Sequence, residues 1–476
     1  MSKKIGILFV SLLVALLLGV GACGNPTVEI PDPGNEYEVN IDFSDEEYNQ
    51  TAKLTVGITS DAFEKTIIEA AAEGFAQLFP NVIIEPVIIT GSSYEQAVNN
   101  RITVGNMTDV LFTSETEGHY FIAKKIFLNL KPYVDAEHAR NGEYVNQFVS
   151  EAWRMGQPGY DGDQYFVPRS SDRIVTHLNT SYIDAAIGAW NTANPSETLP
   201  ADIVKNGWTW DDFLKVCGAL RDYFDTNGKT GHFVVDHSFG FDPVLFSMFK
   251  SFGADISAAN GDFAIDNENT KAMLEAMRAL ITNKYVGSGT QGANYESGQG
   301  AMLFHSSSAM QKYSNFIGEN YDVVTFPVIN GADGTFGYGV PGYGVYAGIS
   351  EGKRDLAWQF LNYVISYDGQ ETLAAAGGNM KTPSVRTDLQ DFATAKWGEG
   401  LRTLNLAATT YQNNRNYSET FFLKYDIEKK NALTSAVKKL VTDAMRYDSK
   451  GEQADFTVET CISECIKALN KAIVAK

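Results

Sequence analysis

Residues 53–89, KLTVGITSDAFEKTIIEAAAEGFAQLFPNVIIEPVII, decide the fold class. Lys53–Thr59 alternates as a strand does, Asp61 stands where an N-cap is expected, and apolar residues then recur at helical spacing until Pro80. Val82–Ile89 is a second apolar run of strand length. A strand, a helix and a second strand in this order predict a parallel β-α-β unit with a right-handed crossover.

The next residues extend this unit. A turn at residues 90–93 is followed by a predicted helix from Tyr94 to about Val104 and a short strand at 109–113. In open α/β sheets, ligands bind beyond the carboxyl ends of the strands. The polar residues at these strand ends are therefore predicted to bind ligand: Asp61, Ser93, Ser114 and Glu115.

The first 23 residues indicate where the chain works. Lys3 and Lys4 precede an apolar run from Ile5 to Val20, which has the anatomy of a signal peptide and is too short for a stable membrane span. The run ends in Val20–Cys23 (VGAC), which resembles the lipobox of bacterial lipoproteins. We therefore expect residues 1–22 to be a lipoprotein signal peptide and Cys23 to carry lipid, palmitate included. The alternative is an ordinary secretory signal that contains a cysteine.

Residues 23–50 are predicted to be a flexible linker. After Cys23 this stretch carries eight acidic residues, three prolines and no Lys or Arg, a composition that favours an extended chain. The folded body should then begin near Thr51. No second apolar run of spanning length follows, so the lipid would be the only membrane anchor.

Composition limits the possible partners. The formal charge of −20 argues against nucleic acid and against charge-driven binding to anionic lipid. The remaining length is enough for two or three compact units. Four cysteines are too few for a disulfide framework, and Cys461 and Cys465 lie four apart on an apolar helical face, as does Cys217 on another stripe. We expect all three to be buried thiols, and we predict no metal site and no cofactor.

Residues 161–168 (DGDQYFVP), followed by Leu178-Asn179, resemble a motif of extracellular solute-binding protein family 1, the binding components of ABC importers for sugars. There it forms the first crossover between two lobes. Five further stretches resemble the family in the same order: Gly207–Phe213 (GWTWDDF), Gly300–Phe304 (GAMLF), Phe326-Pro327 with Gly339–Ile349, Ala357–Leu361 (AWQFL) and Asn379–Pro383 (NMKTP).

The resemblance implies an α/β fold of the type II periplasmic-binding-protein kind, with a cleft between two lobes and a hinge of crossover strands. Lobe 1 would combine residues 51–168 with about 300–370, and lobe 2 would combine about 169–299 with 371–476. It also implies a function. The protein would be a monomeric lipoprotein on the extracellular face of the cell membrane, which captures a carbohydrate, an oligosaccharide in particular, and delivers it to the permease of an ABC transporter.

A sugar cleft needs aromatic faces for C–H surfaces and carboxylate, amide or Arg groups for hydroxyls. Position in the chain therefore adds five candidates to the four at strand ends: Arg169, Asp242, His305, Tyr343 and Asn379. Two alternatives remain open. One is a non-sugar solute such as a peptide or polyamine, and the other is a surface-attached glycoside hydrolase, which needs two carboxyl groups roughly 5–9 Å apart.

Three motifs suggest other functions by letter only. Gly348–Gly352 fits the G-x-S-x-G of a hydrolase, but every histidine precedes Ser350, so we predict a helix N-cap there and no enzyme. Gly337–Gly342 fits G-x-G-x-x-G but runs into an extended stretch rather than a helix. Asp225–Gly231 resembles the start of a calcium loop but lacks the required glycine and glutamate, so a turn after a helix is expected.

Overall fold

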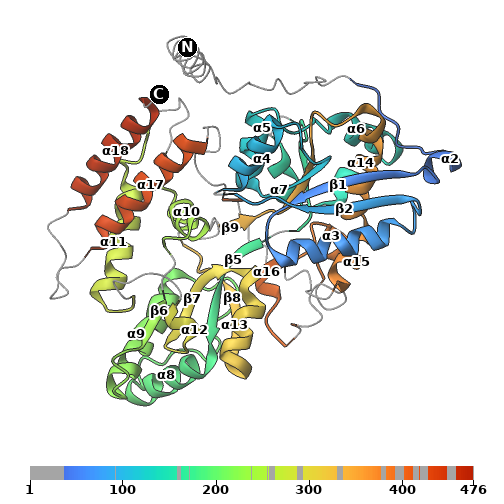
Figure 1. Cartoon of the computed structure of the whole chain (residues 1–476). Helices are drawn as coiled ribbons and strands as arrows, with labels where there is room; N and C mark the ends of the chain where they lie inside the picture. Colours follow the sequence, from blue (N-terminus) through green and yellow to red (C-terminus); the bar gives the residue numbers. More distant parts are fainter. Residues whose placement is uncertain are drawn as a thin grey trace, which may run out of the picture.

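The structure is a computed structural model in which two α/β lobes stand side by side (Figure 1). It describes residues 37–91, 93–157, 162–170, 172–236, 239–254, 256, 263–286, 293–329, 336–376, 382–391, 401, 403–410, 417–418, 427–446 and 457–474. The predicted signal peptide, Cys23 and Asn379 lie outside these residues. The two-lobe α/β fold predicted from the sequence is confirmed.

Lobe 1 is built on a five-stranded sheet with the order β2-β1-β3-β10-β4. The first strand pairs in parallel with β2 and with β3, which confirms the predicted parallel unit, whereas β10 is antiparallel to both of its neighbours. The strands are β1 (Ala52–Ile58), β2 (Val82–Ile88), β3 (Val110–Thr113), β4 (Phe166–Pro168) and β10 (Gly342–Val345).

The helices of lobe 1 cover both faces of this sheet. The chain steps from β1 to β2 in one direction and from β2 to β3 in the other, so right-handed crossovers put α3 and α4 on opposite faces. Helices α14 and α15 pack with α3, and α5 packs with α4. The helices are α3 (Ala62–Phe75), α4 (Tyr94–Thr103), α5 (Glu115–Ala123), α6 (Lys131–Arg140), α7 (Ser150–Trp153), α14 (Glu351–Ile365) and α15 (Tyr367–Ala375).

Lobe 2 is organised around one long strand, β5. It pairs antiparallel with β7 on one side and with β8 and β9 on the other, and β6 extends the sheet in parallel with β7. Residues Arg173–Asn179 of β5 are all buried, so both faces of this strand pack against other parts of the protein, although Thr176 and His177 are polar. The strands are β5 (Asp172–Asn179), β6 (Phe233–Asp236), β7 (Gly300–Ser306), β8 (Tyr321–Thr325), β9 (Phe336–Gly339) and β11 (Tyr417–Ser418).

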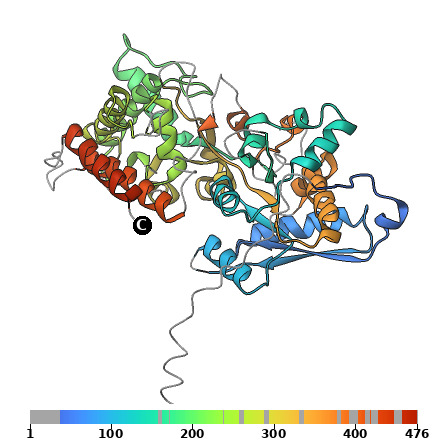
Figure 2. The same cartoon turned by 90° about the horizontal axis from the view of Figure 1, so that it is seen from above.

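The helices of lobe 2 form a thick layer on this sheet, and α18 lies at the far side of the lobe from β1 and β2 (Figure 1, Figure 2). Cys217, Cys461 and Cys465 are buried free thiols here, as predicted. The helices are α8 (Thr180–Ala193), α9 (Trp210–Thr226), α10 (Asp242–Ser251), α11 (Glu268–Thr282), α12 (Ala293–Glu296), α13 (Met310–Ile317), α17 (Ile427–Ala444) and α18 (Val458–Val474); the short α16 (Ala407–Thr410) contacts β5 and β8.

The strand pairing differs from the expected division into lobes. Residues 300–325 were expected in lobe 1, but β7 and β8 both pair with β5 and so lie in lobe 2. Residues 371–389 were expected in lobe 2, but α15 packs on α3, and the Val385 carbonyl accepts a hydrogen bond from the Val149 backbone in lobe 1. The order of strands along the chain does not specify which strands pair, so the sequence alone could not assign residues 300–325 and 371–389 to a lobe.

Residues 37–50, here called the strap, correct the prediction of a linker up to residue 50. This segment lies against lobe 1 and contains a short helix, α2 (Asp45–Tyr48), whose N-cap Ser44 forms a capping box with Glu47. Ile41 is buried, and the Phe43 ring meets the Phe79 ring edge to face at 5.5 Å. A few apolar side chains therefore hold an acidic segment to the body.

Polar contacts fix the strap to α14 and to the segment just before α6. The Tyr37 hydroxyl donates to the Asn129 carbonyl at 2.5 Å, and the Asn40 backbone N–H donates to the Asp355 carboxylate at 3.2 Å. The Gln359 side chain donates to the carbonyl of Ile41 at 3.0 Å. These partners lie far away in sequence, so the strap is part of the tertiary structure of lobe 1.

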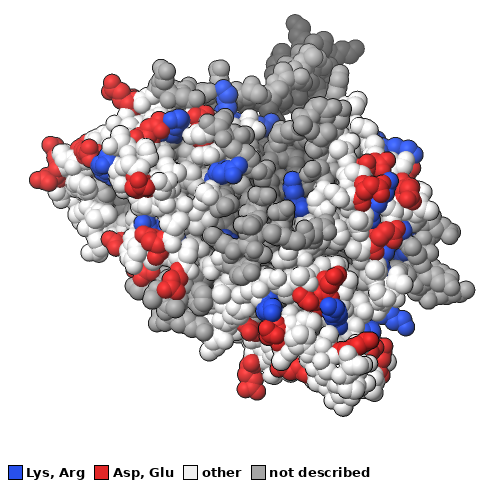
Figure 3. Space-filling model, turned by 180° about the vertical axis from the view of Figure 1, so that it is seen from behind, with Lys and Arg blue, Asp and Glu red and all other residues white. Residues whose placement is uncertain are grey.

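The surface carries charges of both signs. Acidic and basic side chains lie next to one another at both ends of the face in Figure 3. Across the described ranges, no helix is both long and apolar enough to cross a membrane.

The strap should contribute to stability. We expect Ile41→Ala to lower the free energy of unfolding by about 2 kcal/mol, because it removes buried apolar surface and leaves a cavity. Glu38→Ala, in the same segment but exposed, is the matched control and should change it by less than about 0.5 kcal/mol. Urea unfolding followed by fluorescence measures both. Equal midpoints for the two variants would mean that the strap adds nothing to the fold.

Candidate functional site

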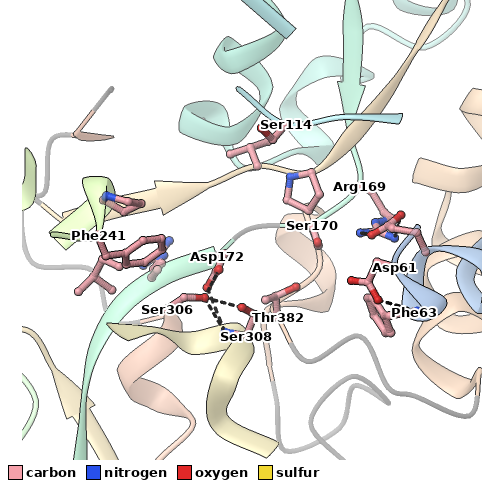
Figure 4. A pocket seen from close by; sticks show the side chains of 16 residues that line it. Asp61, Phe63, Ser114, Arg169, Ser170, Asp172, Phe241, Ser306, Ser308 and Thr382 are labelled. Carbon is pink, nitrogen blue, oxygen red and sulfur yellow. Dashed lines mark hydrogen bonds and ion pairs between the residues drawn. The ribbon is translucent and has the colours of Figure 1, made fainter. Parts of the chain in front are cut away.

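A cavity of about 470 Å³ lies between the lobes at the point where the chain crosses from one sheet to the other (Figure 4). Lobe 1, the crossover segments and lobe 2 all supply its wall. The lining residues are Asp61, Phe63, Glu64, Ser114, Arg169, Ser170, Asp172, Arg173, Ile174, Phe241, Pro243, Ser306, Ser308, Val340, Pro341 and Thr382.

Two crossover segments form the base of the cavity. The first leaves β4 at Pro168 and enters β5 at Asp172, and the second joins β9 to β10 through Val340 and Pro341. They are hydrogen-bonded to each other, since the Arg169 N–H donates to the Pro341 carbonyl at 2.8 Å. The predicted crossover between Phe166 and Ile174 is thus found where it was expected.

Gly342 shows why the second crossover is rich in glycine. A Cβ atom at this position would stand 2.2 Å from the Val167 carbonyl oxygen, so only glycine lets the two strands approach. The glycines around it belong to β9 and β10 rather than to a strand-to-helix turn. The G-x-G-x-x-G letters therefore mark a close backbone contact, and the stretch that follows them is extended, as predicted.

Arg169 is held by a buried ion pair with lobe 1. Its guanidinium donates to the two carboxylate oxygens of Glu64 at 2.8 and 3.2 Å and to the Tyr343 hydroxyl at 3.3 Å, and that hydroxyl donates to Glu64 at 3.1 Å. All three residues are almost fully buried. Burial disfavours the Arg169 cation, but the charge of Glu64, the neighbouring Tyr343 and the hydrogen bond to Glu64 together outweigh it, so the pKa of Arg169 is raised.

Asp172 is held by lobe 2. Its carboxylate accepts hydrogen bonds from the hydroxyls of Ser306 and Ser307 and from the backbone N–H of Ser308, the last two at 2.7 and 3.1 Å. These serines follow the end of β7, which pairs with β5 beside Asp172. Figure 4 shows Asp172 with Ser306 and Ser308 on the cavity wall. The two ends of the first crossover are thus anchored to different lobes.

Aromatic rings reach the cavity from both lobes. Phe63, in the first turn of α3, lies 5.8 Å from the Arg169 guanidinium. Phe241, just before α10, stacks on the His305 ring at 4.9 Å with an interplanar angle of 11°. Burial lowers the pKa of His305, so its imidazole stays neutral behind the Phe241 ring.

A second buried histidine supports the same wall. His177 on β5 must donate from Nε2 to the Ser306 carbonyl at 3.1 Å, which leaves Nδ1 to accept from the Tyr321 hydroxyl at 2.7 Å. Burial lowers the pKa of His177 to about 3, so this arrangement persists at neutral pH. The backbone of Ser306 is therefore fixed from behind.

Three of the predicted binding residues line the cavity: Asp61, Ser114 and Arg169. Each has a structural partner as well. Asp61 caps α3 by accepting from the Phe63 N–H at 2.9 Å, and the Ser114 hydroxyl donates to Glu117.

The other predicted residues lie elsewhere. Ser93 caps α4, Asp242 forms an ion pair with Lys438, and His305 stands behind Phe241. Tyr343 was expected in a loop but is fully buried in β10. Glu115 begins α5, and its side chain is outside the described part of the structure.

Most of the polar and aromatic residues that line the cavity are not among the predicted binding residues: Phe63, Glu64, Ser170, Asp172, Arg173, Phe241, Ser306, Ser308 and Thr382. The rule of strand ends would have found some of them, because Ser306 ends β7 and Ser308 follows it. The pairing of β7 with β5 brings these serines to Asp172, but no local pattern in the sequence predicts this pairing.

The other motifs have structural explanations. Ser350 is the N-cap residue of α14 as predicted, but its side chain makes no capping hydrogen bond. Thr209 forms a capping box with Asp212 at the start of α9, and Asn227 ends that helix, so residues 225–231 begin with the predicted turn after a helix. Among the described residues, no group of three or more His, Cys, Asp or Glu side chains could hold a metal ion.

The buried ion pair generates a testable prediction. Glu64→Gln leaves the Arg169 charge buried without its counterion, so we expect the free energy of unfolding to fall by about 3–5 kcal/mol. Glu69→Gln, on the same helix, breaks only an exposed pair with Lys65 and should cost less than about 1 kcal/mol. Chemical unfolding of both variants is the measurement. A loss for Glu64→Gln as small as that of the control would contradict the importance of the pair.

Solved structures with the same fold include several binding proteins. An ABC substrate-binding protein of Listeria monocytogenes, solved with cycloalternan, matches with a TM-score of 0.67 at 15% identity, covering 90% of this chain and 100% of that one. The cyclic alpha-maltosyl-1,6-maltose binding protein of Arthrobacter globiformis gives 0.67 at 15%, covering 89% and 99%. The GacH receptor of Streptomyces glaucescens, solved unliganded and with acarbose, gives 0.62 at 16%, covering 89% and 99%.

These likenesses establish the fold. The comparison with curated proteins gives no match. Family membership is established by the sequence. The family model for bacterial extracellular solute-binding proteins matches residues 70–403, well over half of the chain. The protein therefore belongs to the bacterial extracellular solute-binding protein family.

Proposed function

We propose that this protein captures an oligosaccharide between its lobes on the extracellular face of the cell membrane, anchored through lipid on Cys23, and delivers it as a monomer to the permease of an ABC transporter. The observation that carries the proposal is the cavity itself. One aromatic ring from each lobe, Phe63 and Phe241, faces it together with carboxylates and hydroxyls. Aromatic faces suit the C–H surface of a sugar ring, and carboxylates suit its hydroxyls.

The ligands of the structural neighbours support the same substrate class. Cycloalternan and acarbose are bound in two of these structures, and cyclic maltosyl-maltose gives the third protein its name; all three are carbohydrates of more than one ring. The support is by analogy of fold, while the chemistry of the cavity is this chain's own.

The anchoring of the crossover suggests how capture works. Arg169 is fixed to lobe 1 through Glu64, and Asp172 is fixed to lobe 2 through three serines. A rotation of the lobes therefore has to be absorbed between these two residues and at Val340-Pro341. Closure would bring Phe63 and Phe241 onto opposite sides of the sugar, and these added contacts are what shift the population to the closed form.

The carboxylates of the cavity favour binding over hydrolysis. Glu64 is paired with Arg169 and Tyr343, and Asp172 accepts three hydrogen bonds. A general acid must give its proton to the leaving oxygen of the substrate, and these two groups are engaged by the protein. We therefore propose a binding protein rather than a glycoside hydrolase.

A thermal-shift screen tests the substrate class. The panel contains maltotetraose, isomaltotriose, cellotetraose and xylotetraose, with spermidine and tetra-alanine as non-sugar solutes. A bound sugar at 100 times its dissociation constant adds about 2.7 kcal/mol to the stability of the folded state, so at least one oligosaccharide should raise the melting temperature. A response to spermidine or tetra-alanine alone would overturn the proposal.

Two further measurements, made with the sugar that raises the melting temperature, complete this test. Small-angle scattering should show a smaller radius of gyration when the sugar is bound, because the lobes close. Chromatography after long incubation should show the sugar intact, and cleavage products that scale with protein concentration would restore the hydrolase alternative.

The lipid anchor has its own prediction. Cys23→Ala removes the acylation site, so the protein should move from the membrane fraction to the soluble fraction. The strap begins at Tyr37, so the melting temperature should not change. Ala22→Gly, which keeps a small residue before the cysteine, is the control and should leave the protein in the membrane fraction. A Cys23→Ala protein that stays in the membrane fraction would show that the lipid is not the anchor.

A further inference from the structure

The feature that carries a further inference is the set of hydrogen bonds around Asp172. A carboxylate offers about four lone-pair sites and no proton. Three of these sites accept from lobe 2: Oδ1 from the Ser307 hydroxyl and the Ser308 N–H, and Oδ2 from the Ser306 hydroxyl. One acceptor site, on Oδ2, remains for a ligand in the cavity.

The serine protons can be counted in the same way. Each hydroxyl has one proton, and those of Ser306 and Ser307 are directed at Asp172. The Ser306 hydroxyl also contacts the Ser308 hydroxyl, and because its own proton is in use, Ser308 is the donor in that contact. All three hydroxyl protons are therefore committed within the protein, and this wall of the cavity presents lone pairs to its contents.

The charges around the cavity agree with this count. Its lining carries three carboxylates, Asp61, Glu64 and Asp172, against two guanidinium groups, Arg169 and Arg173, which leaves one excess negative charge. Arg169 is already occupied by Glu64. An anionic ligand would thus meet acceptors and an excess of negative charge, which disfavours its binding.

A neutral sugar suits the same wall. The carboxylate of Asp172 already accepts three hydrogen bonds, which leaves one acceptor site, and a sugar hydroxyl needs only one acceptor for its proton. The wall therefore matches a neutral hydroxyl donor better than an anionic group.

We propose that Asp172 is a specificity-determining residue that favours uncharged sugars over sugar acids. This inference rests on the proposed function, since it names the chemical class of the carbohydrate. Ser306, Ser307 and Ser308 are the positioning residues that leave Asp172 with one acceptor site.

The first test compares charge classes on the parent protein. Calorimetric titrations use the four neutral oligosaccharides of the screen, with trigalacturonate as the anionic probe. We expect a neutral sugar to bind at least tenfold more tightly than trigalacturonate. Equal or tighter binding of trigalacturonate would overturn the selectivity while leaving a carbohydrate receptor in place. Binding of no sugar at all would overturn the proposed function itself.

The second test assigns the selectivity to Asp172. Asp172→Asn replaces an acceptor by a group that also donates, so affinity for the neutral sugar should fall about 10- to 100-fold, while the preference over trigalacturonate narrows. Asp242→Asn is the matched control, because that carboxylate lies outside the cavity in an ion pair with Lys438, and its affinities should equal those of the parent.

Melting temperatures keep this comparison interpretable. If Asp172→Asn is folded and binds the neutral sugar as tightly as the parent, Asp172 does not determine specificity. If the variant does not fold, a parent protein that shows no preference for neutral sugars over trigalacturonate would still overturn the proposal.

Discussion

The buried contact between Arg169 and Glu64 is the constraint on which the arrangement of the two lobes depends. It joins the residue that leaves the sheet of lobe 1 to the first turn of α3, and Tyr343 on the neighbouring strand bonds to both side chains. A charge taken out of water must be matched by its partner and by hydrogen bonds, so this point of the backbone has little freedom. The crossover begins from a fixed position.

The other end of the crossover is fixed by different chemistry. Asp172 is held by hydroxyls and a backbone N–H rather than by a counterion, and these donors belong to lobe 2. One end of this short segment is thus held by lobe 1 and the other end by lobe 2, and the segment lines the cavity. The residues at the two ends of the crossover, Arg169 and Asp172, also line the cavity. In the proposed function, occupancy of the cavity would therefore be coupled to the angle between the lobes.

The parallel unit of lobe 1 and the crossover at residues 166–174 could be predicted from the sequence, because strand and helix periodicities are local properties. The site could be predicted only in part. Glu64 lies 105 residues from Arg169, and Ser306 lies 134 residues from Asp172, so their contacts depend on strand pairing that no local pattern encodes. Asp61 was identifiable because its position at a strand end is itself local.

Composition was misleading at the N-terminus for a related reason. An acidic, proline-containing segment predicts an extended chain, yet Ile41 and Phe43 are enough to hold residues 37–50 to lobe 1. Average composition over a window dilutes the few apolar residues that decide whether a segment docks. The prediction of a linker was wrong for this half of the segment.

If Cys23 carries the lipid anchor proposed above, the docked strap limits how far the body can lie from the membrane. Residues 24–36 alone would join the anchor to the strap, a reach of at most about 45 Å at 3.3–3.6 Å per residue. The strap is attached to lobe 1, at Tyr37 and Asn129. A tether of this length would confine the body to a thin layer above the bilayer, where its effective concentration toward a membrane partner would be set by geometry rather than by how much protein is made.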